Sequence, residues 1–230
     1  MHVESADVEG LVLTMTKTVD VAGRFVLEDP TSPLPPAQGS GLMILARLAG
    51  DELPSTGSTR STTADQKREF RLTRMFGRRI LDFANVPRGW YVKSIRYGGK
   101  EIIDTATEFK AGTDPAALEV TLSSRGAFVT GRVLDDAGNP VAGARVLMTD
   151  ATRSGRNTLQ RTMATASPGG DFRVGPDRAG DYVLVAIGRG EELPDSRDRE
   201  RMAALLERGE RVTLGSDEER SVDLRVIKPR

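Results

Sequence analysis

The residue types that carry most catalytic and metal chemistry are scarce in this sequence. Its 230 residues contain no cysteine and a single histidine, His2, at the N-terminal edge. Disulfides, zinc clusters and thiol nucleophiles are therefore excluded, and a Ser–His–Asp triad would depend on a terminal residue that is prone to fray. We infer that the chain is not an enzyme, and we expect it to use no cofactor and no metal.

The acidic residues also lack the spacing that metal or acid–base chemistry requires. The acids at 191–192 and 217–219 do not show the alternating ligands and glycine turn of a calcium-binding loop. No pair of carboxylates is spaced in a way that favours general acid–base catalysis. A site made of carboxylates alone is the one enzymatic alternative that remains.

One stretch of the chain is clearly basic. Residues 60–96 contain ten Lys or Arg against three Asp or Glu. Such a surface could bind an anionic polymer, or it could be a solvated strand face balanced by the acids at 101, 104, 108 and 119. The whole chain has 33 basic and 33 acidic residues and 5% aromatics, so we do not expect a nucleic acid partner. The residues of the candidate partner surface here are Arg71, Arg74, Arg78 and Arg79.

Two aromatic residues follow this basic cluster. Trp90 and Tyr91 are expected to begin a strand at one end of a sandwich. Exposed there, they could stack on sugar rings, whereas buried there they would plug the end of the core. Polysaccharide binding through Trp90, Tyr91 and the basic face is therefore an alternative function.

The elements that must position these residues are arranged as two copies of one plan. Residues 11–29 align with 118–136, residues 110–122 echo 213–226, and residues 88–92 echo 179–183. Three echoes in the same order predict tandem modules with a boundary near 123–126.

The second copy has the pattern of an antiparallel β-sandwich. Glycine, proline and aspartate clusters separate short β-branched runs without intervening helices, and these runs cover 126–134, 144–149, 158–165, 171–174, 182–187 and 221–227. Residues 182–187 are apolar on both faces, which predicts a strand covered on both sides.

One helix is expected, over residues 197–208. Met202, Leu205 and Leu206 form its apolar stripe, with Asp195 or Ser196 as N-cap and Gly209 as C-cap. We expect this helix to lie across an end of the second sandwich. The polar residues 54–67 have no periodicity and are expected to form a mobile loop.

The second copy resembles a known family. Residues 129–146 (VTGRVLDDAGNPVAGARV), 169–174 (GGDFRV) and 179–186 (AGDYVLVA) are similar to the carboxypeptidase regulatory-like domains of bacterial envelope and secreted proteins. The resemblance implies a transthyretin-like (prealbumin-like) β-sandwich and an accessory role, and it transfers no activity. Its fold-defining positions here are Gly131, Gly138, Pro140, Gly143, Phe172, Gly180 and Tyr182.

These positions also have a physical interpretation. Gly138 and Pro140 turn the chain after the first strand. Tyr182 can bury its ring while its hydroxyl bonds to the backbone, as in a tyrosine corner. The first copy departs from the family pattern. Residues 29–36 stand where the family has its glycine–proline turn, and residues 79–83 stand where it has the G-x-F motif. Residues 86–91 are expected to keep the last element of the family pattern.

The sequence thus predicts an all-β chain of two tandem antiparallel β-sandwich modules, 6–124 and 126–228, with one short helix in the second. We expect non-catalytic modules that space or dock parts of a larger bacterial envelope or secreted protein. Their partners would be other domains of a longer chain or envelope proteins, with polysaccharide as the alternative. Residues 1–20 show no signal-peptide pattern, which fits either an intracellular protein or a piece of a longer chain, and no apolar run approaches the roughly 20 residues of a membrane helix. The resemblance implies a secreted, periplasmic or cell-envelope location, so we expect a fragment without direct membrane insertion.

Overall fold

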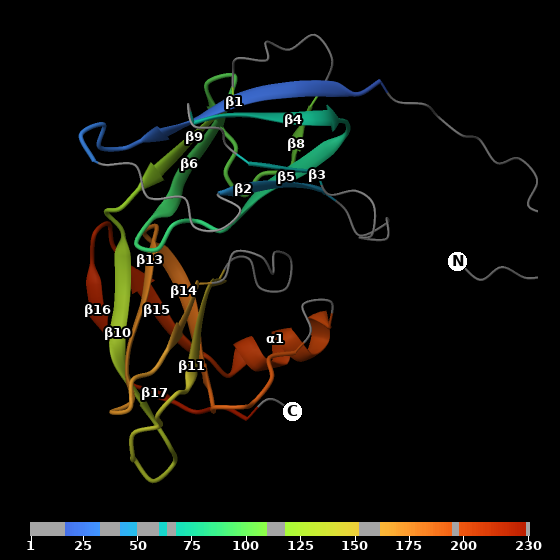
Figure 1. Ribbon diagram of the computed structural model, residues 1–230. Helices are drawn as coiled ribbons and strands as arrows, with labels where there is room; N and C mark the ends of the chain where they lie inside the picture. The colour runs from blue at the N-terminus through green and yellow to red at the C-terminus, as the bar shows by residue number, and fades with distance from the viewer. Residues whose placement is uncertain are drawn as a thin grey trace, which may run out of the picture.

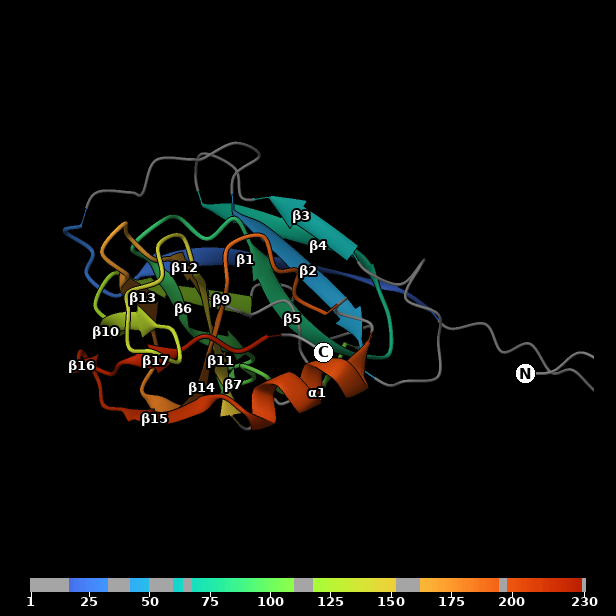
Figure 2. The same ribbon diagram turned by 90° about the horizontal axis from the view of Figure 1, so that it is seen from below.

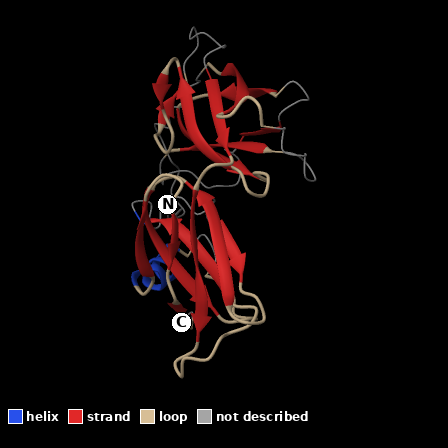
Figure 3. Cartoon of the chain, turned by 90° about the vertical axis from the view of Figure 1, so that its left-hand side faces the viewer, coloured by secondary structure: helices blue, strands red, loops and turns tan. Residues whose placement is uncertain are grey.

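The computed structural model describes residues 17–32, 42–49, 60–63, 68–109, 118–151, 162–194 and 198–228. These residues form strands and one helix, which confirms the all-β prediction. Figure 3 shows two stacks of strands, one above the other, with the helix beside the lower stack.

The first nine strands form two facing sheets. One has the order β4-β1-β9-β6-β7 and the other β3-β2-β5-β8. Between them lies an apolar core that includes Phe25, Phe70, Phe83 and Ile95. The strands are β1 (Val19–Leu27), β2 (Met43–Leu48), β3 (Arg60–Thr63), β4 (Glu69–Met75), β5 (Arg78–Ala84), β6 (Tyr91–Tyr97), β7 (Lys100–Glu101), β8 (Thr107–Glu108) and β9 (Leu118–Ser123).

The remaining strands form a second pair of sheets below the first in Figure 1. One sheet has the order β13-β10-β16, with β17 also paired to β10, and the other has the order β12-β11-β14-β15. Their core includes Val129, Phe172 and Tyr182. The elements are β10 (Ala127–Leu134), β11 (Arg145–Asp150), β12 (Thr162–Thr165), β13 (Asp171–Asp177), β14 (Gly180–Ile187), α1 (Arg199–Glu207), β15 (Glu210–Leu214), β16 (Glu219–Ser221) and β17 (Leu224–Arg225).

The two halves share one strand plan, and two glycines show the correspondence. Gly23 of β1 pairs with Phe70 of β4 on one side and with Leu118 of β9 on the other. Gly131 of β10 pairs with Phe172 of β13, and its neighbour on the other side is Val222. Within the described residues, the alignments of 11–29 with 118–136 and of 110–122 with 213–226 agree with these pairings, whereas residues 11–16 and 110–117 lie outside the described residues.

The third echo, between residues 88–92 and 179–183, is wrong. Tyr91 begins β6, which pairs with β9, whereas Tyr182 lies on β14, which pairs with β11. The spatial counterpart of β14 is β5, because β5 pairs with β2 as β14 pairs with β11. The prediction that residues 79–83 replace the G-x-F motif is also wrong. Phe172 of that motif pairs with Gly131, and the residue that pairs with the equivalent Gly23 is Phe70. Local sequence similarity misled here because it ignores which strands pair.

The helix lies elsewhere than the sequence suggests. Figures 1 and 2 show α1 alongside β11 and β14 rather than across an end of the sandwich. Its N-cap is Asp198, whose side chain accepts from the Arg201 backbone N–H at 3.1 Å. Its apolar side chains cover the outer face of the sheet, where Met202, Leu205 and Leu206 pack with Leu147, Val183, Val185 and Ile187. The prediction of a strand apolar on both faces is confirmed.

The polar residues 54–67 are only partly described. Residues 60–63 form β3, which pairs with β2, so this part is a strand and not a loop. Residues 54–59 and 64–67 lie outside the described residues. The one described helix is too short and too polar to cross a membrane.

Candidate functional site

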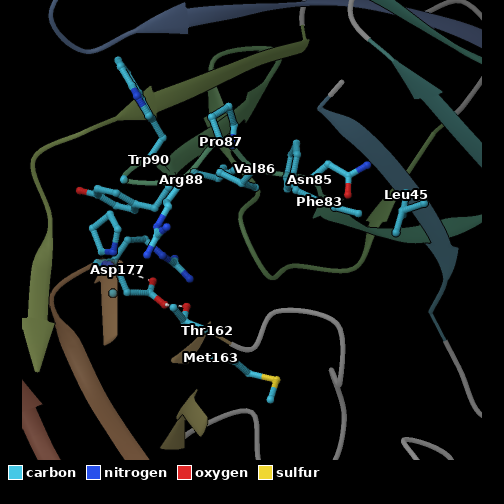
Figure 4. A pocket seen from close by; sticks show the side chains of 17 residues that line it. Leu45, Phe83, Asn85, Val86, Pro87, Arg88, Trp90, Thr162, Met163 and Asp177 are labelled. Carbon is cyan, nitrogen blue, oxygen red and sulfur yellow. Dashed lines mark hydrogen bonds between the residues drawn. The ribbon is translucent and has the colours of Figure 1, made fainter. Parts of the chain in front are cut away.

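A cavity of about 480 Å³ lies where the two sandwiches meet. The first half contributes Leu45 and residues 83–92, and the second half contributes residues 162–163 and 175–178. Figure 4 shows residues from Leu45 to Trp90 on one side of the junction and Thr162, Met163 and Asp177 on the other. The site therefore depends on the relative placement of the two sandwiches.

Arg88 is presented at this cavity by a tight turn. The backbone N–H of Trp90 donates to the carbonyl of Pro87 at 3.0 Å, which makes Arg88 and Gly89 the central turn residues. Gly89 has a φ of 81°, as the third residue of a type II turn requires. Arg88 is exposed, and among the described residues its guanidinium has no ion pair or hydrogen bond.

The other charged groups of the cavity are engaged with protein partners. Arg178 pairs with Asp104 at 2.9 Å, and both side chains are about a quarter exposed. Asp177 accepts from the Arg178 backbone N–H at 2.8 Å and lies 3.5 Å from the hydroxyl of Thr162. With Asp104 counted beside Arg178, the two arginines and two aspartates balance, and Arg88 is the cation of the lining without a partner among the described residues.

The two aromatic residues singled out by sequence line this cavity but serve the fold. Trp90 is half-buried and packs against the core of the first sandwich, and in Figure 4 its ring points away from Asp177 and Thr162. The Tyr91 hydroxyl donates to the Arg125 carbonyl at 2.8 Å. Burial raises the pKa of Tyr91 above its usual value.

Sequence reasoning missed Met163. Its side chain is 47% exposed, and it is the one large apolar side chain that the described part of the chain leaves exposed. It lies on β12 and lines the cavity. The available signal was an apolar residue in the uncharged strand sequence Thr-Met-Ala-Thr.

The basic residues of 71–79 do not join the aromatic pair. Tyr91 pairs with Ser123 at one end of its sheet, whereas Arg71 and Arg74 lie on β4 toward the Val19 end of β1. Since β1 and β9 run parallel, the two groups are roughly 20–25 Å apart along the strands. Arg78 begins β5, and the cavity touches the opposite end of that strand.

Arg79 does not lie on any surface. Its exposure is 0%, and its guanidinium donates to the carbonyls of Ala46 at 2.7 Å and Phe76 at 3.1 Å. The three other arginines are exposed. The Arg71 guanidinium lies 4.0 Å from the Asp20 carboxylate, and the Arg74 backbone N–H donates to the same carboxylate at 3.0 Å. The basic stretch is therefore divided between solvent and core and does not form one patch with Trp90.

The family-motif residues of the second half lie in turns and in the core. Tyr182 is buried and its hydroxyl donates to the Arg178 carbonyl at 2.8 Å, which is tyrosine-corner geometry, and burial raises its pKa strongly. Asp135 closes the turn around Gly138 by accepting from the Asn139 backbone N–H at 2.8 Å. Phe172 is buried, Pro140 bridges to Leu134, and Gly138, Gly143 and Gly180 have positive φ.

The cavity combines a cation, an exposed thioether and backbone and hydroxyl hydrogen-bonding groups, and this set suits non-covalent recognition. Within the described ranges no group of three or more His, Cys, Asp or Glu could hold a metal ion.

Comparison with known proteins adds similarity of low strength. No family model matches the chain, and no curated protein matches it in sequence. One similar solved structure is the Bacillus anthracis TIE protein (12% identity, TM-score 0.29), where the match covers 92% of this chain and 34% of that one. Another is a minor pilin of Streptococcus agalactiae (13% identity, TM-score 0.34), where the match covers 91% of this chain and 98% of that one. A third is a streptococcal ancillary pilin (18% identity, TM-score 0.33), where the match covers 94% of this chain and 64% of that one. This chain spans about a third of the length of the first, and TM-scores below 0.5 support no functional conclusion.

Proposed function

We propose that the chain is a pair of non-catalytic, transthyretin-like β-sandwich domains, 6–124 and 126–228, that space or dock other parts of a larger bacterial envelope or secreted protein. In this proposal the second domain is of the carboxypeptidase regulatory-like kind. The observation that carries it is the tight junction between the sandwiches, because a spacer must hold the parts it joins in a fixed relation.

The junction is short and closely packed. β9 ends at Ser123 and β10 begins at Ala127. The Ser123 hydroxyl accepts from the Arg125 backbone N–H at 2.9 Å and donates to the Arg125 carbonyl at 3.0 Å. A methyl group added at Gly126 would lie 2.8 Å from both the Tyr91 ring and the Pro176 side chain. This packing restricts rotation about the three connecting residues.

Two side-chain interactions reinforce the junction. The Tyr91 hydroxyl reaches the Arg125 carbonyl, and Arg178 of the second sandwich pairs with Asp104 of the first. Because both side chains are partly buried, solvent weakens the attraction between them less than it weakens the attraction in a fully exposed ion pair. Together with the linker packing, these contacts support a rigid two-domain unit.

Small-angle X-ray scattering tests the proposal. A Gly-Ser-Gly-Ser insertion after Arg125 should broaden the distribution of domain orientations, whereas the same insertion after Ala137, in an exposed turn, should not. The unaltered chain should fit a single two-domain shape. Scattering from the unaltered chain that matches the flexible insertion variant would contradict a spacer role.

A further inference from the structure

Methionine is the only sulfur-containing residue of this chain, which has seven methionines and no cysteine. Peroxides oxidise a thioether by adding one oxygen atom to the sulfur, and a polar, chiral sulfoxide then replaces a flexible apolar side chain. The peroxide must reach the sulfur atom, so a methionine in a packed core is protected until the fold opens locally. The exposure of each methionine therefore predicts where the chain is oxidised.

One methionine differs from the others in its exposure to solvent. Five of the seven lie in the described ranges, and the other two precede residue 17. Met163 is 47% exposed, whereas Met43 is half-buried. The remaining three have exposures of 1% or less and belong to the apolar cores, and they are Met75, Met148 and Met202. Within the described residues, Met163 therefore offers the most accessible sulfur atom.

The position of Met163 in the second sandwich keeps its thioether outside the packed core. Met163 of β12 pairs with Leu147 of β11, so both side chains lie on the outer face of the sheet. Leu147 packs under α1, whereas Met163 lies outside that cluster and lines the junction cavity. Figure 4 shows the Met163 side chain directed away from Asp177. Water can therefore hydrate an oxygen atom added to this sulfur without the opening of a core.

We propose that Met163 is the preferred site of oxidation by hydrogen peroxide and that the fold tolerates this modification. Peroxide transfers one oxygen atom to the sulfur of Met163, its O–O bond breaks, and the other oxygen atom leaves as water. The sulfur loses two electrons and the peroxide gains them. Oxidation thus replaces a thioether in the wall of the junction cavity with a polar hydrogen-bond acceptor, while both sandwiches stay folded. This inference rests on exposure and does not depend on the proposed spacer role.

Peptide mass spectrometry after brief treatment of the full chain with hydrogen peroxide tests the proposal. Trypsin cleaves after Lys and Arg, and it places each described methionine in a separate peptide: 25–47, 75–78, 146–153, 162–173 and 202–208. Peptide 162–173 should gain one oxygen atom at least about tenfold faster than the peptides of the three buried methionines, because these react only after local opening. In urea that unfolds the chain, all five peptides should react at similar rates.

Met163→Leu is the matched control, because it keeps an apolar side chain of similar volume and removes the sulfur. Circular dichroism should give the unaltered chain and the variant the same melting temperature before and after the brief treatment. Equal or faster oxidation of any other described methionine would overturn the proposal, and so would a fall in melting temperature on oxidation that Met163→Leu prevents. The scattering experiment uses no peroxide, so loss of this inference is distinguishable from loss of the spacer role.

Discussion

Gly131 occupies a position of the second sandwich where a side chain has no room. Its φ is 152°, and a methyl group there would lie 1.9 Å from the carbonyl oxygen of Val222. The equivalent Gly23 faces the ring of Phe70, where the added atom would lie 2.3 Å away. Both glycines let the first strand of a sandwich approach its neighbours closely.

Gly131→Ala should therefore destabilise the chain severely. We expect the free energy of unfolding to fall by more than about 3 kcal/mol, because the backbone oxygen of Val222 cannot move without breaking its strand pairing. Gly190→Ala is the matched control: its φ is 83° and the space around it is open, so it should cost only about 1–2 kcal/mol. Urea denaturation measures both, and equal losses would contradict the steric argument.

Asp135 makes stability depend on pH. Hydrogen bonds from Asn139, first from its backbone N–H and then from its side chain, lower the pKa of Asp135 in the folded chain. The ionised carboxylate therefore stabilises the fold fully above the unfolded pKa of about 3.9, and this contribution is lost as pH falls through the lower folded pKa.

Asp135→Asn should lower the melting temperature at pH 7, and its difference from the unaltered chain should shrink as the pH falls below about 4. Thermal melts between pH 7 and pH 3 measure this. Asp136→Asn removes the same charge without the bonds to Asn139, so it should have the smaller effect at pH 7. A difference that grows on acidification would contradict the argument.

At the scale of elements, the two sandwiches differ in one segment, which is the helix α1 in the second sandwich and the strands β6 and β7 in the first. α1 lies in the chain between β14 and β15, where the first sandwich has β6 and β7 between β5 and β8. The helix buries the outer face of β11 and β14, and β6 instead extends the sheet of β1 and β9. The same strand plan is thus completed by a helix in one copy and by strands in the other.

Met202→Ala should lower the free energy of unfolding by about 2–5 kcal/mol, because Met202 is fully buried between α1 and the sheet. Glu207→Ala, on the exposed side of the same helix, should change it by less than about 0.5 kcal/mol. Chemical denaturation followed by circular dichroism provides the comparison. Equal effects would mean that the helix contributes little to the fold.

The sequence predicted the existence of α1 better than its place. The stripe of Met202, Leu205 and Leu206 and the following Gly209 identify a helix locally. The sequence also held information on its position, since residues 182–187 are apolar on both faces and the outer face of that strand must be buried by another element. Joining these two signals would have placed α1 on the sheet.

At the scale of the whole molecule, the junction is the feature on which the proposed role of the chain rests. Tyr91, Gly126 and Pro176 pack together there, and the same approach of the two sandwiches creates the cavity with Arg88 and Met163. A flexible linker would leave neither a fixed spacing nor a defined cavity. The scattering experiment therefore tests a direct consequence of this arrangement.

The sequence by itself determined the strand-rich class, the helix, the turn at Gly138 and two of the echoes between the halves, that of 11–29 with 118–136 and that of 110–122 with 213–226. These features depend on residues close together in the chain, through alternation, helical spacing and backbone conformation. Only the tertiary structure decided that Phe70 is the counterpart of Phe172, that Arg79 is buried, and that Arg88 and Met163 meet at one cavity. Each of these depends on packing between residues far apart in sequence, and no local preference encodes which strands pair or how two sandwiches meet.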